Sequence, residues 1–281
     1  MTDQHDKPNR PLPFGAIPTL LKDLLPHAGE EIDPVAMARK DLKSSLPRRF
    51  WTRVEVKQQP DGFGIALDDR LTKTPARKTL LLPSQALAEH LAQEWQAIAE
   101  VIDPAQMPLT RLVNSALDGV SLQMQEVQAD AARYAGSDLL CYRAEMPDRL
   151  VALQHNQWGP LLDWAETDLG ARLHVTKGLF FVEQPDASLA AIRQVVARFD
   201  HPLTLAALHT LTTLTGSVIL ALAVAHQRLK LVEVWALAHL DEDFQMEVWG
   251  HDEEALSRRA AKWREAEVAA LVLSLLPVSK D

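Results

Sequence analysis

The sequence has little cysteine, glycine or tyrosine. Cys141 is the single cysteine among 281 residues, so the chain forms no internal disulfide and suits a reducing compartment. Its apolar neighbours predict that Cys141 is buried, which argues against a catalytic thiol. With 11 glycines, the sequence contains neither a glycine-rich phosphate loop nor a Gly-x-Ser-x-Gly nucleophile motif. No constellation of catalytic residues stands out.

Metal-binding motifs are also missing. The ten histidines show no His-Glu-x-x-His spacing, and no Cys-x-x-Cys pair is present. Two weaker alternatives lie near residue 240. One is a zinc site of His239, Asp243 and His251, and the other is a Mg²⁺ site, or a hydrolase centre, of Asp241, Glu242 and Asp243. Consecutive helical residues point in different directions, so we expect neither a metal nor a cofactor.

The N-terminus lacks an apolar stretch typical of a signal peptide, and it is not Arg- and Ser-rich like a mitochondrial presequence. Leu203 to Ala225 contains no Asp, Glu, Lys or Arg and is long enough to cross a bilayer. Its many threonines and Gly216 instead predict two short buried helices that meet at the glycine. We therefore expect no stable membrane insertion.

The formal net charge of −9 argues against general nucleic-acid binding. The charge is unevenly distributed, however. Arg48 to Leu82 contains eight basic and four acidic residues, whereas Asp241 to Glu267 contains four basic and nine acidic residues. This polarity is suited to orienting a partner. The basic stretch also supports an alternative function, an RNA-associated module that uses Arg48, Arg49, Arg53, Lys73, Arg77 and Lys78 with Trp51 and Phe63.

The first third of the chain predicts an arm and a small sheet. Residues 1–46 contain six prolines and scattered charge, a composition that predicts a flexible arm. Residues 47–83 are predicted to form a β-rich lobe. Its strands are expected at 50–57, 64–67, 70–74 and 79–82, with turns at 58–62 and 68–69.

Residues 84–281 are predicted to form a helical domain. Ser84 is expected to cap the first helix, which runs to about residue 100, and Thr110 to cap the next. Trp158-Gly-Pro160 is expected to interrupt a helix that ends at Gly170, because proline suits a helix start. Further helices are predicted over 123–134, 188–199, 203–213, 216–228, 231–249 and 253–276. The fold class is therefore α+β, a small β-rich N-terminal lobe followed by a mainly α-helical C-terminal domain.

The predicted helix 231–249 has two contrasting faces. Leu237, Leu240, Phe244 and Val248 form a stripe typical of a core. Tryptophan and methionine, which are common at protein–protein contacts, occur on the other face. That face either packs inside the helical bundle or contacts a partner. Its members are Trp235, His239, Glu242, Gln245, Met246 and Trp249.

An ordered set of short motifs gives the chain a family resemblance. From Arg49 to about Leu276 they are Arg49-Phe-Trp51, Leu67-Asp-Asp-Arg70, Lys73-Thr-Pro75, Leu82-Pro-Ser84, Glu94-Trp95, Met107-Pro-Leu-Thr110, Asp138-Leu-Leu-Cys-Tyr-Arg-Ala144, Gln154, Trp158-Gly-Pro-Leu-Leu-Asp-Trp164, Glu242-Asp-Phe-Gln245 and Trp249-Gly250. Their order and spacing resemble the assembly chaperones of F1-ATPase that bind its α subunit.

This resemblance implies a protein without enzymatic activity or cofactor. Its partner is the unassembled α subunit, whose β-facing surface the chaperone covers. A bacterial-type member acts in the cytoplasm. The acidic position on which the family relies matches Glu242 or Asp243, and we favour Glu242 because it shares a face with Gln245 and Trp249. The implied partner-binding residues are Glu242, Asp243, Gln245, Trp249, His239 and Met246. Two residues depart from the family pattern: Gly159, where members often carry an acid, and Asp243, where glutamate is commoner.

Overall fold

Four short antiparallel strands begin the part of the chain that the structure describes. This computed structural model describes residues 46–178, 180–250 and 252–278, and the arm predicted at residues 1–46 lies outside them except for its last residue. Strand β2 pairs with each of the other three, so it is the central strand. The strands are β1 (Val54–Gln59), β2 (Gly62–Leu67), β3 (Arg70–Leu71) and β4 (Leu81–Leu82).

Both predicted turns of the sheet are present. The first contains Pro60 and Asp61 and ends at Gly62, where a Cβ atom would lie 2.5 Å from the Leu82 carbonyl oxygen. In the second, Asp68 and Asp69 take positive φ angles of 46° and 72°. Such angles fit a two-residue turn that follows the twist of a hairpin.

The first strand begins at Val54 and not at Phe50 as predicted. Two backbone N–H groups in the preceding stretch, those of Thr52 and Arg53, donate to the Asp68 carboxylate. These bonds take the place of a strand ladder. Just before them in the chain, the Trp51 ring is buried against Trp95, with centroids 5.2 Å apart.

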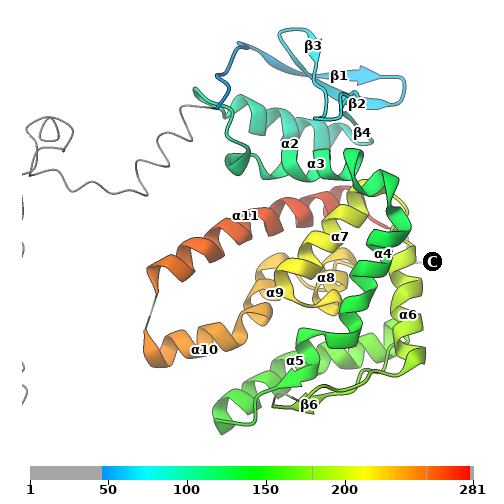
Figure 1. The fold of residues 1–281 in the computed structure, drawn as a ribbon, viewed down its shortest axis with the longest axis vertical. Helices are drawn as coiled ribbons and strands as arrows, with labels where there is room; N and C mark the ends of the chain where they lie inside the picture. The colour runs from blue at the N-terminus through cyan, green and yellow to red at the C-terminus, as the bar shows by residue number, and fades with distance from the viewer. Residues whose placement is uncertain (1–45, 179, 251, 279–281) are drawn as a thin grey trace, which may run out of the picture. The chain divides into compact units, whose positions relative to one another are not determined.

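Ten helices follow in the described residues, which confirms the α+β fold class (Figure 1). Helix α7 is central and contacts α3, α4, α8 and α11. A parallel pair of two-residue strands, β5 (Tyr142–Arg143) and β6 (Thr176–Lys177), lies beside α5. The helices are α2 (Gln85–Gln96), α3 (Pro108–Asp118), α4 (Met124–Arg133), α5 (Asp148–Leu169), α6 (Asp186–Ala197), α7 (Pro202–Thr215), α8 (Val218–Ala225), α9 (Leu231–Ala238), α10 (Leu240–Trp249) and α11 (Glu253–Leu275).

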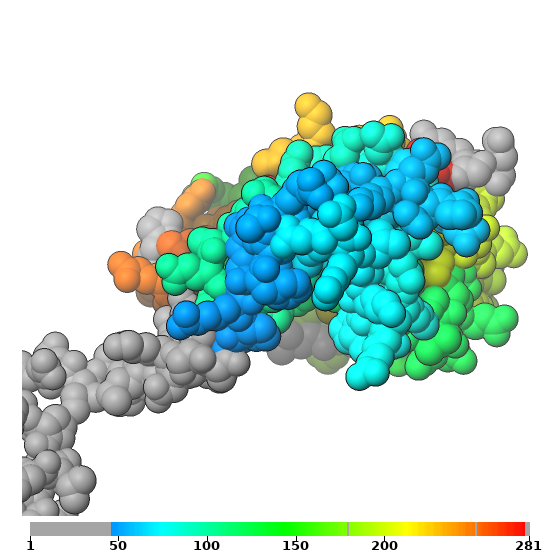
Figure 2. Space-filling view, turned by 90° about the horizontal axis from the view of Figure 1, so that it is seen from above, coloured from blue at the N-terminus to red at the C-terminus, as the bar shows by residue number. Residues whose placement is uncertain are grey.

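The sheet packs on α2 (Figure 1), and the segment between β3 and β4 also bonds the end of α3 through Thr74 and Lys78. Figure 2 looks down on the sheet from outside, where its residues form the blue and cyan surface. Buried Ile65, Leu80 and Leu82 of the sheet region join Leu87 and Leu91 of α2 in one hydrophobic core. The strands and the helices therefore share a core and belong to one compact unit, Pro47–Asp281.

Helices α7 and α8 meet at Gly216, as predicted. Gly216 takes a φ of 68°, the left-handed conformation in which glycine commonly ends a helix. Nearly all of α8 is buried. Among the described residues no helix is long and apolar enough to cross a membrane.

The predicted interruption of α5 at Trp158–Pro160 is wrong, because α5 continues through it. Trp158 is fully buried and its indole N–H donates to the Leu237 carbonyl oxygen at 2.9 Å. Leu161 and Trp164 are buried on the same side. Pro160 lies on the exposed side, where water can bond the carbonyl that its ring leaves without a donor. Packing on the buried side therefore keeps the helix continuous.

Helix α3 begins at Pro108, and Thr110 is not its N-cap. The cap comes from another helix. The Glu94 carboxylate of α2 accepts from the backbone N–H groups of Leu109 and Thr110, both at 2.8 Å, and from the Thr110 hydroxyl at 2.6 Å. A negative charge at a helix N-terminus also interacts favourably with the helix dipole.

The substitution Glu94→Ala is expected to lower the free energy of unfolding by about 2 kcal/mol, because it removes the cap of α3. Urea unfolding measures this change. Glu89→Ala is the matched control, since Glu89 is an exposed acid on the same helix that bonds only Gln85. Equal losses in the two variants would show that Glu94 is not a cap.

A second prediction concerns Asp138, a fully buried carboxylate that accepts from the N–H groups of Leu140 and Ile219. Burial raises the pKa of Asp138 to about 6. The folded state therefore holds a proton that the unfolded state releases, so stability falls as pH rises from about 4 to 6. Asp138→Asn should remove that dependence on pH. The gap between the unfolding free energies of the parent protein and the variant should therefore change by roughly 3 kcal/mol between pH 4 and 6. Urea unfolding at several pH values checks it, and a constant difference would contradict it.

Candidate partner-binding surface

The single helix predicted over 231–249 is two helices, α9 and α10, which separate at His239. His239 has φ −111° and ψ 17°, outside the helical region. Its ring Nδ1 lies 2.9 Å from the Trp235 carbonyl oxygen, to which its backbone N–H also donates. A side chain that bonds its own helix in this way competes with the next helical turn.

The break turns two predicted surface residues inward. His239 is 6% exposed, and its ring packs against Trp235 with centroids 4.2 Å apart. Trp235 is also buried and contacts Trp263 of α11 edge-on at 5.3 Å. Burial lowers the pKa of His239, so the ring stays neutral at pH 7. These rings join α9 to α11 and leave the predicted face to α10 alone.

A groove between α10 and α11 collects the remaining predicted residues. Its volume is about 350 Å³. Glu242, Gln245, Met246 and Trp249 line it from α10, and His239 lines it from the junction of α9 and α10. The opposite wall comes from α11 and consists of Ala255, Arg258, Arg259 and Lys262. Sequence periodicity did not predict this wall, because it cannot pair residues of different helices.

Asp243 does not face the groove freely. Its carboxylate accepts two hydrogen bonds from the Arg259 guanidinium, one of them at 3.1 Å. The Arg259 side chain is only 20% exposed. This ion pair fastens α10 to α11, so the structure gives Asp243 a structural contact.

Of the predicted residues, Glu242 and Trp249 are both exposed and have the features of a contact site. Among the described residues, Glu242 accepts no hydrogen bond and forms no ion pair. Trp249 is 85% exposed at the end of α10, beside Val248. The predicted core stripe is only partly buried: Leu240 is interior, but Val248 is exposed. A large aromatic ring in water next to an unpaired acid is typical of a contact site.

The other side of α10 is held to α5 by polar contacts. Buried Gln154 donates to the Asp241 carboxylate at 2.7 Å and accepts from the Ala144 N–H at the same distance. Arg149 pairs with Glu247 at 2.7 Å. These contacts attach one side of α10 to α5 and leave the side that lines the groove without such contacts to α5.

The alternative metal sites find little support. Asp241 bonds Gln154, Asp243 bonds Arg259, and Glu242 is exposed, so the three acids do not converge. His251, the third residue of the predicted zinc site, lies outside the described residues. Within those residues no three His, Cys, Asp or Glu side chains are grouped as metal ligands. Burial raises the pKa of Cys141 to about 12, so its thiol is unreactive.

Three of the six basic residues predicted to bind RNA make contacts within the fold. Arg49 donates to the Trp51 and Ile98 carbonyl oxygens, and Lys78 donates to that of Leu117. Arg53 pairs with Asp69 at 2.9 Å. Trp51 is buried and is therefore not available to stack on a base.

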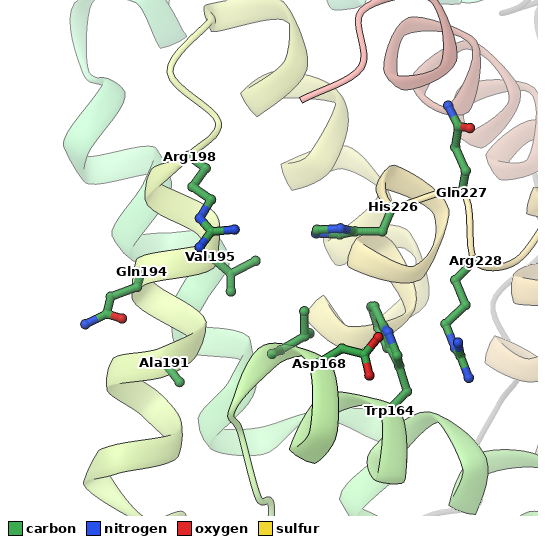
Figure 3. Close-up of a pocket in the computed structure, with 10 residues that line it drawn as sticks. Trp164, Asp168, Ala191, Gln194, Val195, Arg198, His226, Gln227 and Arg228 are labelled. Carbon is green, nitrogen blue, oxygen red and sulfur yellow. The ribbon is translucent and has the colours of Figure 1, made fainter. Parts of the chain in front are cut away.

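Another cavity, of about 520 Å³, lies where α5, α6 and α8 end (Figure 3). Arg198 and His226 point into it, and the Asp168 carboxylate points toward the Trp164 indole. Arg228 lies over the Trp164 ring at 5.5 Å. Arg198 follows the last residue of α6, and Arg228 lies just beyond the end of α8. A cation at a helix C-terminus interacts favourably with the helix dipole.

Comparison with known proteins identifies the family. A family model described as ATP12 chaperone protein matches residues 48–166. A solved structure of a putative chaperone from Agrobacterium tumefaciens is 47% identical, covers 88% of this chain and 92% of its own, and superposes with a TM-score of 0.80. The chain belongs to the ATP12 chaperone family. The resemblance to chaperones of ATP synthase assembly that the sequence motifs indicated is thus confirmed.

Two further ATP12 proteins are similar over most of the chain. The crystal structure of Atp12 from Paracoccus denitrificans is 44% identical, covers 81% of this chain and 97% of its own, and has a TM-score of 0.76. The mitochondrial atp12 protein of Schizosaccharomyces pombe is 26% identical over 220 residues, 74% of this chain and 75% of that protein. The ATP12 family model ends at residue 166, so the α10–α11 groove lies beyond it.

The two neighbouring acids of α10 should differ in stability. Asp243→Asn is expected to lower the free energy of unfolding by about 1 kcal/mol, because it leaves the Arg259 cation without its carboxylate. Glu242→Gln should change it by less than about 0.5 kcal/mol, since Glu242 has no partner to lose. Thermal or urea unfolding measures both, and a larger loss in Glu242→Gln would reverse the assignment.

Proposed function

We propose that this ATP12-family chaperone binds the unassembled α subunit of F1-ATPase and shields the surface that later faces the β subunit. The exposed end of α10 carries the proposal: Trp249 is 85% exposed and borders a groove that also contains unpaired Glu242. The contact consists of Glu242, Gln245, Met246 and Trp249.

The composition of this surface suits a protein partner. Trp249 and Met246 offer apolar area on side chains that contribute strongly to interfaces. Glu242 offers a charge that a cationic group of the partner can pair with. Asp241, Asp243 and Glu247 of α10 bond neighbouring helices, and α10 contributes only Leu240 to the buried core. The groove side of the helix is therefore the part available for contact.

The family relationship supplies the reason for such a surface. A subunit of a ring that lacks its neighbours exposes apolar interface, which promotes aggregation. A chaperone that covers this interface needs a matching apolar contact and no catalytic step. We further propose that the chain acts in the bacterial cytoplasm, where an α subunit waits for its β partners.

Glu242→Lys and Trp249→Ala should each weaken capture of the purified α subunit, Trp249→Ala by about 30-fold because truncation of a central tryptophan at an interface commonly costs about 2 kcal/mol. Both should leave the circular-dichroism melt nearly unchanged, since neither side chain is buried. The measurement is co-elution of chaperone and α subunit on size-exclusion chromatography, followed by titration.

Matched controls are available on the β-rich side of the chain. Glu89→Lys makes the same charge change at an exposed position of α2. Phe50→Ala removes an aromatic ring that is 72% exposed. Both controls should bind the α subunit like the parent protein. If Glu242→Lys unfolds the chain, Glu242 is structural and the contact surface is wrong. If the parent protein fails to bind the α subunit, the proposed function itself is wrong.

A further inference from the structure

Gly159 occupies an unexplained position in the middle of α5. Glycine is unfavourable inside a helix relative to alanine, and Gly159 has no positive φ angle that would require it. A Cβ atom at Gly159 would meet no other atom within 4 Å, so close packing does not require it either. Its bare backbone borders open space.

That space is a pocket of about 450 Å³ between α5 and the segment around β6. Aliphatic side chains cover much of its surface, and Gly159 lines it from α5. The pocket has the size and lining of a site for one large apolar group. The aliphatic residues are Val151, Leu162, Leu173 and Val175.

Positive charge predominates at the wall of the pocket. Arg143 lies over the Trp158 ring at 5.0 Å and donates to the Gln154 carbonyl oxygen, but its Nε has no hydrogen-bond partner. Within the described residues, neither Arg143 nor Lys177 forms an ion pair. Arg172 is paired with Glu166. The pocket is therefore lined by two cations without an ion pair, Arg143 and Lys177, and by one such acid, Asp163.

Exposed apolar side chains also follow β5 and β6 in the sequence. Phe180 and Phe181 are 77% and 74% exposed, and Met146, which follows β5, is 77% exposed. Val175 both lines the pocket and is partly open to solvent. Large apolar side chains exposed together mark interaction sites.

We propose that the pocket between α5 and β6 binds an aromatic or large aliphatic side chain accompanied by a carboxylate, presented by a segment of the client subunit. The apolar group lies on Gly159, and the carboxylate faces Arg143 and Lys177. This inference rests on the proposed function for the client, and it adds a second contact at a site separate from the α10–α11 groove.

The ligand class is tested directly with N-acetyl-L-phenylalanine, which carries one aromatic ring and one carboxylate. A ligand of this size in a matching pocket should bind with a Kd on the order of 1 mM. Amide NMR shifts should centre on Gly159 and Lys177. N-acetyl-L-phenylalaninamide, which lacks the charge, should bind at least about threefold more weakly to the parent protein.

Gly159→Leu fills the pocket and should weaken binding of N-acetyl-L-phenylalanine at least about tenfold, while its melting temperature stays equal or rises because leucine favours a helix. Ala152→Leu, the same kind of enlargement at an exposed position of α5 outside the pocket, should bind like the parent protein. Gly159→Leu should also capture the α subunit at least about tenfold more weakly than Ala152→Leu.

The outcomes separate this inference from the proposed function. Absence of N-acetyl-L-phenylalanine binding to the parent protein at about 20 mM, well above the expected Kd, would overturn the ligand class even if the α subunit is captured. Undiminished capture by Gly159→Leu would overturn the role of the pocket in client binding. If the parent protein binds N-acetyl-L-phenylalanine but no α subunit, the proposed function fails while the ligand class stands.

Discussion

Burial of the uncharged helix α7 positions the rest of the helices. Leu203, Leu205, Leu208 and Leu211 of α7 are fully enclosed, surrounded by α3, α4, α8 and α11. Apolar burial of this extent is the main favourable term in folding. Because α11 packs along α7, it is fixed as a rigid support, and α10 is then attached to it from outside. The core and the contact surface are thus built by different interactions, the first by apolar packing and the second by hydrogen bonds and ion pairs.

Features that depend on neighbouring residues were predictable from the sequence. The turns at 58–62 and 68–69 and the helix end at Gly216 follow from the conformations that Gly, Pro and Asp favour. Glu242, Gln245 and Trp249 share a face because they lie within one helix. These local rules gave the fold class and half of the groove.

Features that depend on distant residues were not predictable. Glu94 caps a helix that begins fourteen residues later, and no local pattern announces that contact. The break at His239 depends on ring packing among Trp235, His239 and Trp263, the last from another helix. Likewise, Trp158 keeps α5 continuous through Pro160 by bonding α9. Helix periodicity favours Glu242 over Asp243 as the contact acid, but it could not predict that Asp243 pairs with Arg259 of α11.

Leu240 is the one buried residue within α10, all of whose residues are described. Phe244 packs against the core from a partly buried position, but substitutions on the groove side of this helix leave the apolar core intact. Selection can alter the contact residues one at a time to follow changes in a client, with little risk that the chain loses its fold. The sparse anchoring of α10 thus separates the evolution of recognition from the preservation of stability.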